Sequence, residues 1–193
     1  MPVDAQTGAS VLFRVDGQLV FGIAGTREPG HPDGRFYAGI GGRRVLGETF
    51  ADCARREAVE EMGVEPELRS AAATWLLRAG ARPEPIAVVE EPAPLAIYVM
   101  PRLPSTRQYA TAVYDADVHG APRVLGGDEL SALIALTDRQ VLAGRRATIA
   151  TLLDEGATLL DRTPALTLET RVFPVGAAVA ASMLAHAGLG PSA

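Results

Sequence analysis

The sequence contains no lysine and no asparagine, and all 18 of its basic residues are arginines. They are outnumbered by 23 acidic residues, so the formal net charge is -5 at pH 7. A protein that binds the phosphate backbone of a nucleic acid needs a basic surface. The charge balance therefore argues against a nucleic-acid scaffold. It does not exclude a small anionic substrate that a metal ion holds locally.

Cysteine and histidine are also scarce. Cys53 is the only cysteine, which excludes an intramolecular disulfide and a thiolate zinc cluster. The three histidines, at positions 31, 119 and 186, are far apart and lack metal-ligand spacing. We therefore expect each histidine to be an ordinary surface or packing residue.

Long apolar runs are missing as well. The N-terminus lacks the basic start and apolar stretch of a signal peptide. The most apolar run, residues 172–185, is too short to span a bilayer and contains proline and glycine. These features predict a cytoplasmic enzyme or binding protein without a membrane partner.

The chain is long enough to form one domain with a substantial core, and 48% of its residues are hydrophobic. Strand patterns and helix patterns are mixed along it, which predicts an α/β (α+β mixed) sandwich. We expect a hairpin around Asp16-Gly17, a short strand at 36–38, and strands within 67–77, 85–91, 94–100 and 111–118. One helix is expected from Thr49 to Gly63 and another from the capping box of Thr137 and Gln140 to about Asp154.

The segment from 53 to 64, CARREAVEEMGV, places three glutamates on one short helix. Glu57, Glu60 and Glu61 fall within an arc of about 100°, beside an apolar stripe that starts at Phe50. Like charges at these spacings repel by a few tenths of a kcal/mol per pair. A solvated acidic face is one interpretation of this pattern. The other is a cation site, because a hard divalent ion prefers carboxylate and carbonyl oxygens.

The residues just before the helix favour the cation site. GGRRVLGE supplies two glycines, a short loop and Glu48, which can form an ion pair with Arg56. From Gly42 to Val64 the sequence reads G-x5-E-x7-R-E-A-x-E-E-x-G-V. This pattern resembles the Nudix box of the Nudix hydrolases at every fixed position. The resemblance implies an α/β/α sandwich with a mixed sheet.

The resemblance also implies chemistry, namely the hydrolysis of a diphosphate linkage in a nucleoside diphosphate joined to another group. Mg²⁺ or Mn²⁺ is the implied cofactor. Glu57, Glu60 and Glu61 then resemble metal ligands, and one of them resembles the base that activates water. The carbonyl of Gly41 is a further expected ligand, and Arg56 with Glu48 is the expected positioning pair. Which glutamate is the base stays open.

Several candidate residues lie outside the box. Some family members carry another acid in a late loop, where this chain has GGDEL, so Glu129 or less favourably Asp128 is a candidate metal ligand. Arg27, Arg35 and Arg44 are candidate substrate-binding residues, since a guanidinium can bind a phosphate through two hydrogen bonds. An ordinary turn acid and solvated loop arginines are the alternatives. The tyrosines at 37, 98, 109 and 114 are expected mainly in the core or on strand faces.

The box does not identify the substrate. ADP-ribose, a nucleotide sugar, a nucleoside triphosphate or an unusual metabolite all fit it. Two other functions stay open, a Nudix-fold sensor module without turnover and an enzyme like isopentenyl-diphosphate isomerase. We expect a single Nudix hydrolase domain over 1–193, with a core at about 8–160 and a C-terminal strand and helix at about 163–193. A homodimer is also expected.

Overall fold

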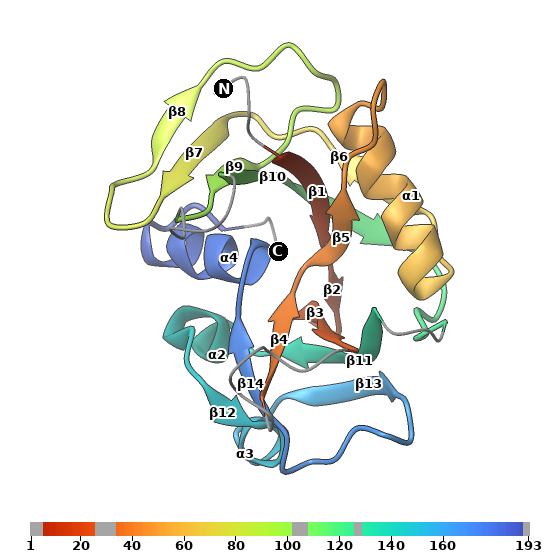
Figure 1. Cartoon of the computed structure of the whole chain (residues 1–193). Helices are drawn as coiled ribbons and strands as arrows, with labels where there is room; N and C mark the ends of the chain where they lie inside the picture. The colour runs from red at the N-terminus through yellow and green to blue at the C-terminus, as the bar shows by residue number, and fades with distance from the viewer. Residues whose placement is uncertain (1–5, 26–33, 102–107, 126–128, 191–193) are drawn as a thin grey trace.

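The structure is a computed structural model, and it describes residues 6–25, 34–101, 108–125 and 129–190. In these ranges the strands form two seven-stranded sheets, here called sheet A and sheet B. Both sheets contain parallel and antiparallel pairs. The predicted mixed α/β architecture is therefore confirmed (Figure 1).

Sheet A contains the first strand of the chain and the longest one. In spatial order its strands are β5 (Ile40–Arg43), β1 (Gln6–Leu12), β10 (Tyr109–Val118), β9 (Ala96–Val99), β7 (Thr74–Arg78) and β8 (Glu84–Ile86), with β6 (Pro66–Arg69) paired to β10. Strand β10 runs parallel to β1 and antiparallel to β9. Among the described strands, β5 lies at an edge of this sheet and pairs only with β1.

In sheet B strand β11 lies between β3 and β13, and all seven residues of this strand are buried. The spatial order is β12 (Ala147–Thr148), β14 (Arg171–Pro174), β4 (Gly34–Ala38), β3 (Gln18–Ala24), β11 (Leu130–Leu136) and β13 (Thr158–Arg162), with β2 (Arg14–Val15) paired to β3. Strands β4 and β5 follow each other almost without a break, so residue 39 is where the chain passes from sheet B to sheet A.

Four helices complete the described ranges: α1 (Phe50–Met62), α2 (Asp138–Ala143), α3 (Ile149–Asp154) and α4 (Ala177–His186). Figure 1 shows α1 and α4 on opposite sides of strands β1 and β5. One hydrophobic cluster includes the buried face of α4, and a second includes the buried face of α1. Each cluster also includes residues from strands of both sheets, so both sheets contribute to the packing of each helix.

The predicted hairpin turn and the predicted ends of helix α1 are confirmed. Asp16 and Gly17 both have positive φ, 49° and 79°, as a two-residue hairpin turn of type I′ requires. Helix α1 begins after Thr49, whose hydroxyl accepts the N–H of Asp52, and it ends at Gly63 in the left-handed conformation.

The helix predicted to run from Thr137 to Asp154 is wrong in its length. Its capping box is present, but the helix ends at Ala143 because Gly144 adopts a left-handed conformation with φ of 51°. The chain then forms the short strand β12, and a second helix starts behind its own cap, Thr148. Of the strand expected in 85–91, only residues 85 and 86 are in a strand, β8, and the side chain of Glu90 accepts the N–H of Ala51 at the start of α1.

Other elements escaped prediction. Strand β5 lies in a stretch that its glycines and arginines indicated as loop, and strands β11 and β13 were not predicted.

The C-terminal strand and helix are part of the folded core: β14 pairs with β4, and five residues of α4 are buried in this chain. The alanines of α4 therefore pack against other residues of the same chain. The domain boundaries and the homodimer stay predictions. No helix in the described ranges is long and apolar enough to cross a membrane.

The cap of α1 generates a stability prediction. Replacing Thr49 by alanine removes the acceptor of the Asp52 N–H, and we expect the free energy of unfolding in urea to fall by about 1 kcal/mol. Thr49→Ser keeps the hydroxyl and should unfold close to the unmodified protein. Equal stabilities of the alanine and serine variants would contradict this assignment of the cap.

Candidate active site

The site forms where strand β5 faces helix α1. A side chain at Gly42 has no room, since a Cβ placed there would lie 2.4 Å from Oε2 and 2.5 Å from Oε1 of Glu57. The N–H of Gly41 donates to Oε2 of Glu61 at 3.0 Å. Two glutamates of the helix thus meet two consecutive residues of the strand. Close approach of carboxylates to main chain is the physical reason for the glycine pair.

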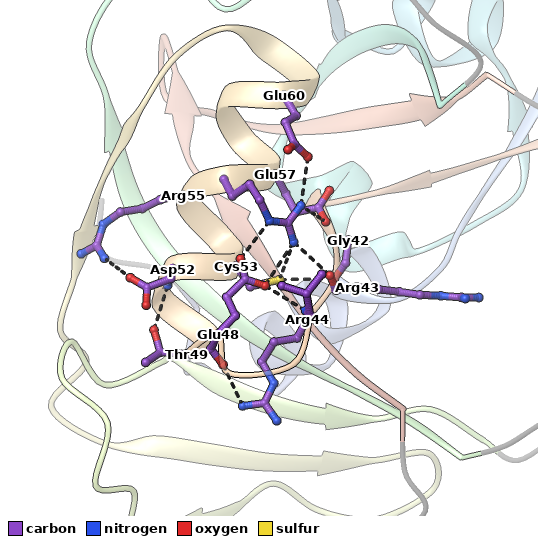
Figure 2. Close-up of polar contacts among 12 residues, drawn as sticks. Gly42, Arg43, Arg44, Glu48, Thr49, Asp52, Cys53, Arg55, Glu57 and Glu60 are labelled. Carbon is purple, nitrogen blue, oxygen red and sulfur yellow. Dashed lines mark hydrogen bonds and ion pairs between the residues drawn. The ribbon is translucent and has the colours of Figure 1, made fainter.

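Arg56 connects the loop before the helix with the glutamates on it. Its Nε donates to Oε1 of Glu48 at 2.8 Å, and one terminal nitrogen donates to Glu57 at 2.8 Å and Glu60 at 2.9 Å. The other terminal nitrogen donates to Oε2 of Glu48 at 3.2 Å and to the carbonyl of Arg43 at 3.0 Å. Figure 2 labels Glu48, Glu57 and Glu60, the three acids that these hydrogen bonds join to Arg56. The predicted Glu48–Arg56 ion pair is therefore present.

The pKa values of the glutamates move in opposite directions. The hydrogen bond from Arg56 lowers the pKa of Glu48. Burial raises the pKa of Glu57, which is 8% exposed, even though Arg56 opposes the change. Burial also raises the pKa of Glu61, to about 7, against the opposing effect of the Gly41 N–H. Glu48 is thus stabilised as an anion, whereas burial disfavours the ionised forms of Glu57 and Glu61.

Glu129 belongs to the same electrostatic cluster. Its negative charge contributes to the raised pKa of both Glu57 and Glu61, as does that of Glu60. Its carbonyl accepts the N–H of Gly25 at 2.8 Å, which places it at the end of strand β3. The fold therefore brings Glu129 from a distant part of the sequence toward the glutamates of α1. Asp128, the less favoured candidate, lies outside the described residues.

The donor set suits a hard divalent cation, because it consists of carboxylates and main-chain oxygens. Within the described ranges, however, no three acidic, histidine or cysteine side chains are arranged as a ready metal site. The reason is visible in the hydrogen bonds: Arg56 engages Glu57 and Glu60, and Glu61 faces the Gly41 N–H. A cation would have to replace the guanidinium as the partner of those carboxylates.

The candidate substrate arginines are placed differently from one another. Arg35 donates to the carbonyls of Ala24 and Gly25, so it lies at the same end of β3 as Glu129. Arg44 donates to Oγ1 of Thr7 at 3.1 Å, and its guanidinium lies 4.5 Å from the centre of the Phe50 ring. Arg27 lies outside the described residues. The substrate-binding roles of all three stay predictions.

Sequence reasoning missed Tyr109 as a neighbour of the site. Its hydroxyl donates to the carbonyl of Gly42 at 3.3 Å. The tyrosine starts strand β10, far from the box in sequence, and it was expected in the core or on a strand face. The parallel pairing of β10 with β1 brings it there, and no local pattern predicts that pairing.

Comparison with solved structures identifies the fold. A protein described as a possible asymmetric diadenosine tetraphosphate (Ap4A) hydrolase from Jonesia denitrificans is similar over 99% of both chains, with a TM-score of 0.52 and 14% identity. A MutT Nudix hydrolase from Burkholderia pseudomallei aligns over 67% of this chain and 80% of its own, with a TM-score of 0.47 and 21% identity. A MutT protein from Methanosarcina mazei aligns over 75% and 86%, with a TM-score of 0.48 and 11% identity. No protein-family model matches the sequence, and no curated protein sequence matches it.

The raised pKa of Glu61 predicts a pH-dependent stability in EDTA. A glutamate in an unfolded chain has a pKa of about 4.3. Because the folded value of about 7 is higher, the folded state binds more protons than the unfolded state between these two values. Ionisation of Glu61 therefore lowers the free energy of unfolding as the pH rises from about 4 to about 7.

Glu61→Gln mimics the protonated carboxyl, so its stability relative to the unmodified protein should increase over this pH range. Urea unfolding at several pH values between 4.5 and 8 measures the difference. Glu65→Gln, at an exposed position just after the helix, is the matched control and should show no such trend. A stability difference for Glu61→Gln that stays constant or shrinks as the pH rises would refute the assignment.

Proposed function

Because the chain has the fold of the Nudix hydrolases and carries a complete Nudix box, we propose that it is a metal-dependent hydrolase of a diphosphate linkage. The substrate class is a nucleoside diphosphate joined to another group. One observation supports the proposal above the others. The carboxylates of Glu57 and Glu61 lie against Gly42 and Gly41, and the pKa values of both are raised. Glu60 and Glu129 add negative charge around them.

Without a cation, this arrangement of carboxylates lowers the stability of the fold. Buried carboxylates of like charge oppose folding, and only one guanidinium is bonded to the helix glutamates in the described residues. Glu57, Glu60, Glu61, Glu129 and the carbonyl of Gly41 are the groups that would hold Mg²⁺ or Mn²⁺. When bound, such an ion neutralises charge on the phosphoryl oxygens and lowers the pKa of a coordinated water molecule.

The chain's own residues then divide into two roles. Glu57 and Glu61 are the glutamates of the helix with raised pKa values, so we assign the acceptance of a proton from water to one of these two. Glu48 and Arg56 are positioning residues, because their paired hydrogen bonds fix the loop before the helix to the helix itself. Arg35 and Arg44 remain candidates for binding substrate phosphates, together with Arg27.

A product screen by mass spectrometry tests the function. The panel contains ADP-ribose, nucleotide sugars, nucleoside triphosphates, CoA and dinucleotides, and it includes Ap4A because of the similarity to the Jonesia denitrificans protein. Each compound is incubated with Mg²⁺, Mn²⁺ or EDTA. We expect cleavage of the diphosphate linkage in one class of compound, with either metal ion and not with EDTA.

The matched variants are Glu57→Gln and Glu61→Gln, which keep side-chain size and remove one charge each. Loss of the proton-accepting carboxylate should lower kcat by about 10²-fold or more. The far-ultraviolet circular dichroism of both variants should match that of the unmodified protein. Tight binding of one compound without turnover would instead identify a sensor module, and an isomerised product would identify an isomerase.

A further inference from the structure

The segment from Gly41 to Arg43 is held at three consecutive points of its main chain. Glu61 accepts the N–H of Gly41 at 3.0 Å, and Arg56 donates to the carbonyl of Arg43 at 3.0 Å. Between them, the carbonyl of Gly42 accepts the hydroxyl of Tyr109 at 3.3 Å. The first two partners belong to the box. The third comes from strand β10, on the other side of β1.

The contact with Tyr109 depends on a glycine in the strand between. A Cβ at Gly8 would lie 2.0 Å from the hydroxyl oxygen of Tyr109 and 2.2 Å from the carbonyl oxygen of Gly42. Gly8 pairs with Thr111 of β10 on one side and with Arg43 of β5 on the other. The missing side chain of Gly8 therefore leaves the space in which the hydroxyl reaches across β1 to the carbonyl.

The alternative donor to this carbonyl is weak. The thiol of Cys53 approaches the Gly42 oxygen at 3.8 Å from the side of helix α1, and a thiol is a poor donor. The Tyr109 hydroxyl keeps its proton throughout the working pH range, because burial raises its pKa to about 12. Tyr109 is therefore the stronger of the two side-chain donors bonded to the carbonyl of Gly42.

We propose that Tyr109 is a positioning residue for the carboxylate site, where it fixes the Gly42 carbonyl and so holds the Gly41–Arg43 segment against Glu57 and Glu61. The reason is geometric: Gly42 is in contact with the Glu57 carboxylate on one side and bonds to Tyr109 through its carbonyl. Among the described strands β5 pairs only with β1, so side-chain bonds to its main chain add to the restraint from that one pairing. The inference rests on the proposed function, in which these glutamates hold a divalent metal ion.

The test is a Mn²⁺ titration of the full chain, with free Mn²⁺ measured by electron paramagnetic resonance. Loss of a residue that orients metal ligands without binding the metal lowers metal affinity or activity by about tenfold or more. We expect Tyr109→Phe to weaken Mn²⁺ binding by about this factor and to lower kcat on the substrate found in the screen, with KM unchanged. Gly8→Ala, whose Cβ would displace both the Tyr109 hydroxyl and the Gly42 carbonyl, should weaken Mn²⁺ binding at least as strongly.

Tyr98→Phe is the matched control, because Tyr98 is a buried tyrosine on the same face of sheet A, opposite Thr111, whereas Tyr109 is half-buried. It should leave Mn²⁺ affinity unchanged. If Tyr109→Phe lowers the melting temperature but leaves Mn²⁺ affinity and kcat unchanged, the hydroxyl is structural and the inference is wrong. Glu57→Gln separates the two proposals: if it does not weaken Mn²⁺ binding either, the metal site itself fails.

Discussion

The hydrogen bonds of one guanidinium decide the arrangement of the site. Arg56 bonds to Glu48 through two nitrogens and also reaches Glu57, Glu60 and the carbonyl of Arg43. These bonds raise the pKa of Arg56 further above its ordinary value, so the charge is permanent. A single positive charge cannot neutralise the surrounding carboxylates. Burial is the larger cause of the raised pKa values of Glu57 and Glu61, and repulsion by the excess negative charge adds to it.

The hydrogen bonds of Arg56 are distributed unequally among the glutamates around it. Glu48 receives two bonds from the guanidinium and also accepts the N–H of Val45, so it is well satisfied as an anion. Glu61 receives one main-chain N–H and no guanidinium bond among the described residues. Pairs of acids whose environments push their pKa values apart are typical of sites that do acid–base chemistry. The same helix thus contains Arg56 and two glutamates whose negative charge Arg56 does not fully compensate.

Sequence reasoning succeeded where the determinants are local. The ends of helix α1 depend on Thr49 and Gly63, and the hairpin turn depends on Asp16 and Gly17, so short patterns predicted them. It failed where distant segments decide the outcome. Glycine in strand β5 indicated a loop, because the need for it arises from the Glu57 carboxylate across the site. Strand β11 was missed for a similar reason: a fully buried strand lacks the alternation that marks a half-exposed one.

The candidate site shows the same division. The box residues are close in sequence, and their spacing on one helix predicted that they would meet. Glu129 and Tyr109 join them only because β11 pairs with β3 and β10 pairs with β1. No pattern around either residue contains that information. Helix α1 therefore supplies the charged groups. Strand β5, which these groups face, is oriented by the hydroxyl of Tyr109, which reaches the Gly42 carbonyl across Gly8 of β1. A carboxylate cluster of this kind needs both, because repelling groups stay in place only when their surroundings are rigid.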